Sequence, residues 1–180
     1  MKILLILLLS IIMHANSKQK MFTLYQDHKY KKVCDLGFNN FRKNNKDEEY
    51  ISLYAFACLK SDYIDRLSTP IVMLKSSKEA RSNAAYFSVI LMQKKLLYHS
   101  LVDGLKLSQL KFPTTDYILS KVFDFYSKIG VHEQRLFYLF KDEKDPKLTY
   151  KLYISKGPKV DKMIIEEYYD LVILQRHTYW

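Results

Sequence analysis

The two cysteines are the residues whose type and spacing most directly suggest chemistry. Cys34 and Cys58 are the only cysteines of the 180-residue chain. If the turn between the predicted helices that carry them is centred near Lys46, each lies twelve residues from the turn, and both sit at one height across an antiparallel helix pair. One interpretation is a disulfide, which would stabilise this hairpin by about 3 kcal/mol. The other is two buried thiols that do not meet, because the axes of packed helices lie about 8–10 Å apart.

The other reactive side chains are not spaced as catalytic or metal sites require. No two histidines are four residues apart, so a helix cannot present a histidine pair to a metal. The adjacent carboxylates Glu48-Glu49 and Glu166-Glu167 would point apart on a helix. The four glycines form no phosphate-binding loop, and neither cysteine belongs to a Cys-X-X-Cys motif. We therefore expect no catalytic, cofactor-binding or metal-binding residue and no enzymatic activity; a hydrolase with its site in the loop Lys106–Pro113 is the enzymatic alternative.

Aromatic side chains are abundant, with fifteen tyrosines in the chain. Tyrosine is enriched in protein interfaces because it combines a large apolar area with a polar tip. The interfaces between packed helices also bury aromatic residues, so most of the tyrosines are expected in or near the core. The aromatic cluster near the C-terminal end is the candidate partner surface, and its members are Tyr168, Tyr169, Tyr179 and Trp180.

One hydrophobic pattern occurs twice between residues 21 and 74, and it predicts the elements that position the cysteines. Four residues at offsets of 0, 4, 8 and 11 recur 33 residues later; they are Tyr30, Cys34, Phe38 and Phe41, followed by Tyr63, Leu67, Ile71 and Leu74. A second group with helical spacing precedes each set, so each unit is expected to be a helix pair. Periods of about 20–50 residues are typical of stacked helical hairpins.

Further hairpins are expected along the chain. Helices over Lys78–Gln93 and Lys94–Leu105 would form a third hairpin, and helices over Asp116–Lys128 and His132–Lys141 a fourth. The predicted fold is therefore all-α, a solenoid of about four antiparallel helical hairpins over residues 18–141.

Residues 18–105 resemble tetratricopeptide or Sel1-like helical repeats. The resemblance rests on small residues where hairpins must pack closely and on an aromatic residue before each second helix, and these are Ala55, Ala57, Ala84, Ala85, Tyr30 and Tyr63. The Trp, Leu-Gly and terminal Pro of the full consensus are absent, so the resemblance is to the class of helical repeats. It implies a protein–protein scaffold that holds its ligands on a concave face.

Residues 142–180 are expected to form a small C-terminal cap on the repeat stack. A charged linker, Asp142–Pro146, begins the segment, and Tyr150–Ile154 reads as a strand. A short helix near Asp161–Glu166 and a strand over Asp170–Arg176, paired with the first strand in a β-hairpin, would complete the cap. The alternative for residues 160–180 is a helix with Ile164 and Tyr168 on one face.

The first seventeen residues have the features of a secretory signal peptide. Lys2 precedes an apolar run, Ile3–Met13, and Ala15-Asn16-Ser17 offers small residues for cleavage after Ser17. The run is shorter than the roughly 20 residues of a membrane helix, and the leader ends without a cysteine that could carry a lipid. We expect a periplasmic, non-lipidated mature chain without a transmembrane segment.

The chain is basic, with 29 Lys and Arg against 19 Asp and Glu, a formal net charge of +10. An exported basic protein meets anionic lipids, cell-wall polymers or acidic protein faces, and we expect no nucleic-acid partner. The alternative is a solvated Lys-rich surface without a specific ligand.

These observations predict a non-enzymatic periplasmic scaffold or adaptor without a cofactor. Its partner would be another envelope protein or a larger assembly, and the flagellar motor is an example by analogy with other repeat proteins. The alternative function is a basic binding module for the cell wall or for anionic glycan or lipid surfaces.

Overall fold

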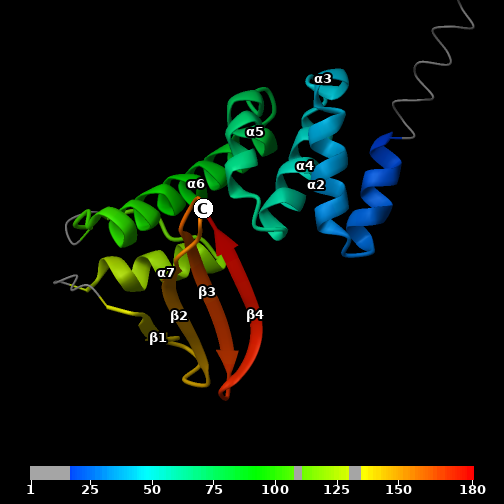
Figure 1. Cartoon of the computed structure of the whole chain (residues 1–180). Helices are drawn as coiled ribbons and strands as arrows, with labels where there is room; N and C mark the ends of the chain where they lie inside the picture. Colours follow the sequence, from blue (N-terminus) through cyan, green and yellow to red (C-terminus); the bar gives the residue numbers. More distant parts are fainter. Residues whose placement is uncertain (1–16, 108–110, 130–134) are drawn as a thin grey trace, which may run out of the picture. The chain divides into compact units, whose positions relative to one another are not determined.

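The computed structural model describes residues 17–107, 111–129 and 135–180. Helices are the only regular elements described up to Ser127, and a four-stranded antiparallel sheet follows them (Figure 1). The fold is mixed α/β, and the expected all-α solenoid of about four hairpins is wrong. The chain divides into two compact units, Met1–Phe87 and Ser88–Trp180. Of the predicted signal peptide, residues 1–16 lie outside the described residues.

The N-terminal unit is helical in its described part. Residues 17–26 form a first helix. The later elements are α2 (Tyr30–Asn39), α3 (Phe41–Asn44), α4 (Glu48–Lys60), the 3-10 helix η1 (Ile64–Leu67), α5 (Ser68–Met73) and the start of α6 (Lys78–Asp103). None of the described helices has the length and apolar character that crossing a membrane requires.

The centre of this unit is the antiparallel pair α2 and α4, which lie side by side in Figure 1. Gly37 of α2 faces Tyr54 of α4, and a Cβ atom at Gly37 would lie 2.7 Å from both Cβ and Cγ of Tyr54. A glycine costs about 1 kcal/mol of helix propensity relative to alanine, so its place inside α2 is explained by this close approach. Tyr50, Ile51 and Tyr54 of α4 are buried.

The second copy of the hydrophobic pattern forms a 3-10 turn that is continued by a short α-helix. Tyr63 precedes the single turn of η1, and Leu74 follows the six residues of α5. Pro70 lies in the first turn of α5, a position at which helices tolerate proline. The 3-10 turn passes directly into α5, so the second copy forms the helical segment of residues 64–73 after α4, as the first copy forms α2 after the helix of residues 17–26.

The expected third hairpin is also wrong, because Lys78–Gln93 and Lys94–Leu105 form one continuous helix. The α6 helix has 26 residues, from Lys78 to Asp103. It contains no glycine or proline that could break it near Gln93. Gly104 ends it with φ of 78°, a conformation that suits glycine, and its N–H donates to the carbonyl oxygen of Ser100 at 3.0 Å.

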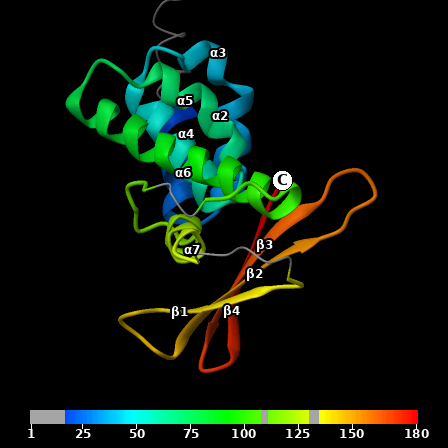
Figure 2. The same ribbon diagram turned by 90° about the vertical axis from the view of Figure 1, so that its left-hand side faces the viewer.

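The C-terminal unit contains the rest of α6, from Ser88 onward, together with α7 (Ile118–Ser127) and the sheet. Its strands are adjacent in chain order and all antiparallel: β1 (Tyr138–Lys141), β2 (Leu148–Ser155), β3 (Lys162–Tyr169) and β4 (Val172–Tyr179) (Figure 2). One face of the sheet packs on α7, where the Phe125 ring stacks on Phe140 and Tyr150, with centroids 5.8 and 5.9 Å apart. Tyr126 meets Tyr138 edge to face.

Three expectations for this part of the chain are corrected. The helix expected at His132–Lys141 is wrong over residues 138–141, which form β1, while residues 132–134 lie outside the described residues. The helix expected at Asp161–Glu166 belongs to β3 instead. The strands expected at Tyr150–Ile154 and Asp170–Arg176 correspond to β2 and most of β4, but β3 lies between them.

The predicted boundary after Lys141 falls between β1 and β2, which pair from Tyr138↔Leu152 to Lys141↔Thr149.

Candidate functional site in the N-terminal unit

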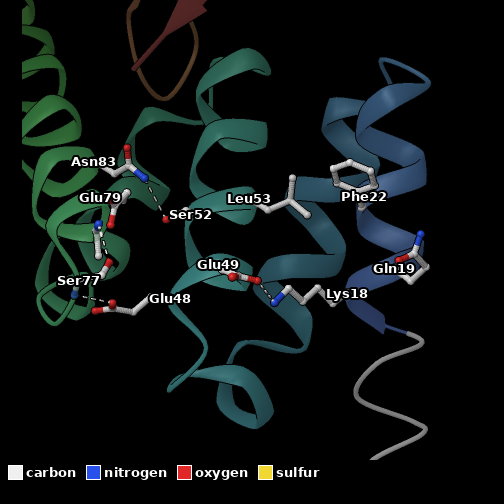
Figure 3. A pocket seen from close by; sticks show the side chains of 11 residues that line it. Lys18, Gln19, Phe22, Glu48, Glu49, Ser52, Leu53, Ser77, Glu79 and Asn83 are labelled. Carbon is white, nitrogen blue, oxygen red and sulfur yellow. Dashed lines mark hydrogen bonds and ion pairs between the residues drawn. The ribbon is translucent and has the colours of Figure 1, made fainter.

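A cavity of about 790 Å³ lies on the N-terminal unit, and we refer to it as the groove. Three segments form its walls: the helix of residues 17–26, the first turns of α4, and the start of α6 (Figure 3). Its lining residues are Lys18, Gln19 and Phe22 from the first helix, Glu48, Glu49, Ser52 and Leu53 from α4, and Ser77, Glu79, Ala80 and Asn83 from the α6 side.

The α4 wall begins with a strong helix start. The side chain of Asp47 accepts the backbone N–H of Tyr50 at 3.0 Å and so caps α4. Glu48 and Glu49 follow in the first turn, where carboxylates interact favourably with the helix dipole.

Glu48 ties the segment before α6 to the start of α4. Its carboxylate accepts three backbone N–H groups, from Lys75 at 2.9 Å, Ser76 at 2.6 Å and Ser77 at 3.0 Å. The bonds from Ser76 and Lys75 contribute most to lowering the pKa of Glu48 to about 2, because they stabilise the ionised form. We call this set of bonds the Glu48 clamp.

Two further contacts hold the α6 side of the groove. The Ser77 hydroxyl oxygen accepts the backbone N–H of Ala80 at 3.0 Å and caps α6. The side-chain amide of Asn83 donates to the hydroxyl of Ser52 on α4 at 3.2 Å (Figure 3). The two serine side chains are thus engaged in positioning the walls.

Lys18 connects the first helix to α4. Its ammonium pairs with Asp47 at 3.1 Å and with Glu49, which it also contacts in Figure 3. Partial burial opposes the charged form, but the hydrogen bonds to Glu49 and Asp47 prevail and raise the pKa of Lys18. The pairs are accessible to solvent, so each contributes at most about 1 kcal/mol.

The groove combines an apolar floor with a mainly acidic rim. Phe22 is 48% exposed, Leu53 is half-buried and Ala80 is buried. The rim carries three carboxylates, Glu48, Glu49 and Glu79, against the single ammonium of Lys18. No histidine or cysteine is among the lining residues. The arrangement suits binding of an apolar ligand with positive charge.

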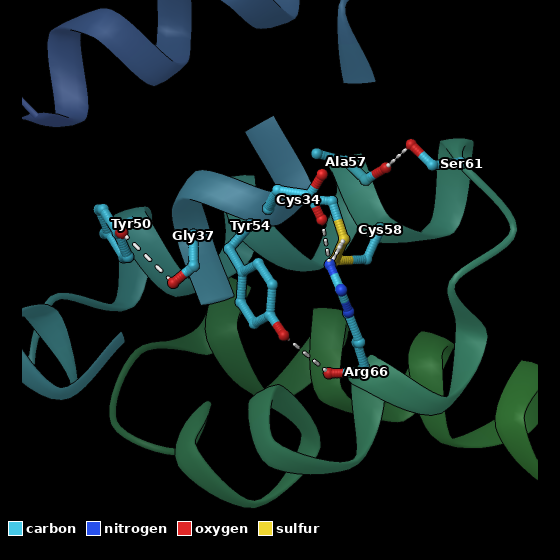
Figure 4. The surroundings of a disulfide bond; sticks show 9 residues. Cys34, Gly37, Tyr50, Tyr54, Ala57, Cys58, Ser61 and Arg66 are labelled. Atoms are coloured by element: carbon cyan, nitrogen blue, oxygen red, sulfur yellow. Dashed lines mark hydrogen bonds and ion pairs between the residues drawn. A yellow bond between two sulfur atoms is a disulfide. The ribbon is translucent and has the colours of Figure 1, made fainter. Parts of the chain in front are cut away.

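A disulfide braces the helix pair behind the α4 wall. Cys34 of α2 and Cys58 of α4 are bonded, and their Cα atoms are 4.7 Å apart (Figure 4). Gly37 lies one turn from Cys34 and permits this close approach of the two backbones. The structure thus joins the two cysteines that sequence analysis placed at one height on an antiparallel pair.

Arg66 packs against the disulfide. Its guanidinium donates to Asp35 at 2.8 Å and to the sulfur of Cys34 at 3.2 Å. It also lies over the rings of Phe38 and Tyr63, with its central carbon 4.9 and 4.6 Å from their centroids. These contacts occupy the arginine and attach η1 to α2.

The four aromatic residues of the candidate partner surface are not gathered in one place. Strand register places Tyr179 opposite Met163, at the other end of β3 from Tyr168 and Tyr169, a separation of about 20 Å at the rise of a β-strand. Tyr179 is 1% exposed, whereas Trp180 and Tyr169 are 49% and 42% exposed. Tyr168 donates its hydroxyl to Glu166 at 2.8 Å.

The groove is not evident from the sequence, in which Glu48 and Glu49 stand out only as adjacent carboxylates. The two side chains do serve different partners, the segment 75–77 and Lys18. A local signal for one wall was present in the helix-start pattern of Ser76 and Ser77 before α6. In the part of the chain that the structure describes, no group of three His, Cys, Asp or Glu side chains could hold a metal ion.

Comparison with known proteins adds no relative to this picture. No protein-family model matches the chain, and no curated protein or solved structure is significantly similar to it. A family relationship to tetratricopeptide or Sel1-like repeats therefore stays a prediction. The all-α solenoid expected with it is wrong, because the fold is mixed α/β.

Proposed function

We propose that this chain is an exported, non-enzymatic binding protein whose groove holds a segment of another envelope protein. The observation that carries the proposal is an apolar groove with a mainly acidic rim on a chain of net charge +10. The Cys34–Cys58 disulfide supports export, because structural disulfides persist in oxidising compartments such as the periplasm.

The chemistry of the groove selects an amphipathic segment with basic residues. Phe22 and Leu53 offer apolar area, and Glu49 and Glu79 offer negative charge beside it. A helix with apolar anchors on one side and Lys or Arg at the flank meets both requirements. The Glu48 clamp and the capped helices hold the walls in place before binding, which lowers the entropic cost of association.

The proposal includes a role as scaffold or adaptor in a larger envelope assembly, such as the flagellar motor. The analogy with repeat proteins no longer supports that role, since the observed fold is not a repeat stack. Its remaining support is the groove, which provides a place for a partner segment.

Site-specific photo-crosslinking in the exported full-length protein tests the groove. A benzoylphenylalanine at Phe22 is compared with one at Val72, which is 72% exposed on α5 and does not line the groove. We expect crosslinks from position 22 to an envelope protein, through a peptide that contains apolar residues and Lys or Arg.

Charge reversal on the rim provides the second arm of this test. Glu49→Lys combined with Glu79→Lys should lower the yield from position 22 about tenfold, which corresponds to roughly 1.4 kcal/mol. Equal yields at positions 22 and 72, or a yield unchanged by the rim variants, would contradict the proposal.

A second candidate function, binding to cell-wall polymers or anionic glycans, is favoured by the outward face of the sheet. Register places four basic residues on the face opposite α7, where Glu166 is the only carboxylate of the described strands; they are Lys141, Lys151, Lys162 and Arg176. Sedimentation with purified cell wall should weaken as salt rises. Binding that salt leaves unchanged would count against this function.

A further inference from the structure

The two edges of the sheet are protected to different degrees. The β1 edge has four residues and carries Lys141. The β4 edge has eight residues, without proline, lysine or any acidic residue. Natural sheets protect their edges with short strands, lysines, prolines, bulges or covering segments, because unpaired backbone groups attract other strands. By its length and its lack of lysine and proline β4 is the less protected edge, although it contains one bulge.

The open part of β4 is its first half, Val172–Arg176. Val172, Ile173 and Leu174 are 65%, 51% and 60% exposed, whereas His177 and Tyr179 are buried. A bulge lies in this half, since Glu167 pairs with Gln175 and Tyr168 with Ile173, so that Leu174 has no partner on β3. The available edge is therefore short and apolar.

The turn that precedes β4 has a left-handed backbone and presents one apolar side chain, Leu171. Asp170 and Leu171 have φ of 51° and 70°, a left-handed conformation that a bulky leucine rarely adopts. Leu171 is 90% exposed, so packing within the described structure does not explain why a leucine occupies this turn position. An exposed leucine in a strained turn beside three exposed apolar residues points to a binding role for this end of the hairpin.

We propose that Val172–Arg176 accepts an extended segment of another protein as an added strand. The backbone N–H and C=O groups on the outer side of β4 supply the hydrogen bonds, and the exposed side chains set the preference for apolar residues. This surface is separate from the groove and does not depend on it.

The positive charge of Arg176 favours a negatively charged residue on the incoming segment. Its side chain is 53% exposed, and its Nε lies 3.7 Å from Glu166. A guanidinium has five N–H donors, more than one carboxylate uses. No acidic residue occurs in Val172–Tyr179, so a carboxylate on the added strand beside Arg176 completes a cross-strand pair.

A second copy of this chain fits the edge less well than another protein. A stable dimer buries about 800 Å² per partner, more than a five-residue edge provides. Two copies would each bring a net charge of +10, and each β4 would bring its own bulge into the pairing. A short extended segment of opposite charge needs only a small area, is attracted by the charge of the chain, and brings no second bulge into the pairing.

The test uses the isotope-labelled full-length chain and two probe peptides. One is a blocked peptide of alternating Thr and Val with a single Glu, and the other has Lys in place of Glu. We expect NMR shift changes centred on the amides of residues 172–176, with the Glu peptide bound about tenfold more tightly than the Lys peptide. Arg176→Gln should remove this preference while leaving the fold intact by circular dichroism.

Matched variants on the two edges separate strand addition from general stickiness. Ile173→Thr keeps a good strand former and should weaken binding, whereas Leu139→Thr on β1, where Leu139 is 63% exposed, should leave it unchanged. Shift changes outside the β4 edge, equal binding of both peptides, or the absence of binding at millimolar concentration would overturn the proposal. Sedimentation velocity that shows a dimer abolished by Ile173→Thr would assign the edge to a second copy instead.

Discussion

The N-terminal and C-terminal units leave different groups available to a partner. In the N-terminal unit, helices satisfy their own backbone groups, and side chains cap helix starts at Asp47 and Ser77. A partner there meets side chains in a groove. In the C-terminal unit, β4 is the last strand of the described sheet, and its residues Val172–Arg176 are exposed. A partner there can bind the backbone itself.

The two units also differ in what stabilises them. The N-terminal unit has a covalent link between α2 and α4, together with the Arg66 contacts around it. The C-terminal unit relies on aromatic packing of α7 against the sheet, through Phe125 and Tyr126. Chemical reduction should therefore act on one unit and spare the other, and a set of variants can test each side of this contrast.

The largest expected effect follows from removing the disulfide. Cys34→Ser with Cys58→Ser should lower the free energy of unfolding by about 3 kcal/mol, since the link closes a loop with a sequence separation of 24. Urea unfolding measures the loss, and hydrogen exchange should localise it to amides of residues 17–87. Thiol labelling of the unreduced wild-type protein is the control. Equal loss of protection in the sheet would show that the units are not independent.

The next effect concerns the close approach of α2 and α4. Gly37→Ala places a methyl group 2.7 Å from two carbon atoms of Tyr54, so the helices must separate or the ring must move. We expect a net loss of about 1–3 kcal/mol, despite the better helix propensity of alanine. Thermal unfolding measures it. A gain in stability would mean that the helix pair can relax, and the double variant Gly37→Ala, Tyr54→Leu should recover part of the loss.

Helix starts were predictable because their signals are local. The Asp47-Glu48-Glu49 sequence identifies the start of α4, and Gly104 marks the end of α6. The number of hairpins was less accessible, because the apolar spacing of residues 78–105 does not show where a helix breaks. The absence of a breaker near Gln93 was the available signal for one long helix.

The sheet and the groove depend on contacts between distant residues, which hydrophobic spacing does not encode. Residues Met163 to Glu166 of β3 are all buried, so the segment lacks the alternation that identifies a half-exposed strand. Glu48 meets residues 27 to 29 positions away, and this pairing exists only after α4 and α6 are placed. The disulfide could be predicted as one of two interpretations, because both cysteines belong to one hairpin and their distances from its turn can be read from the sequence.

A smaller effect of opposite sign is expected at the β3–β4 turn. Leu171→Asn should stabilise the protein by about 1 kcal/mol, because asparagine tolerates the left-handed conformation and the exposed leucine packs little. Val160→Asn is the control, since Val160 is 49% exposed and has no positive φ. Unfolding in urea measures both. A destabilised Leu171→Asn variant would show that the leucine packs in the folded protein and would remove the strain argument for the turn.

The smallest effect on overall stability is expected from the Glu48 clamp, and its pH dependence distinguishes it from the other ties of the N-terminal unit. The folded pKa of about 2 lies below the ordinary value of 4.5, so the clamp stabilises the ionised form. Its contribution is complete above pH 4.5 and is lost as pH falls toward 2. Glu48→Gln should remove this acid sensitivity and increase hydrogen exchange at residues 75–77 at neutral pH. Glu79→Gln, on the same rim, is the control. If wild type and Glu48→Gln exchange equally at pH 7, the clamp does not hold the α6 wall, and the groove has to be formed by the partner on binding.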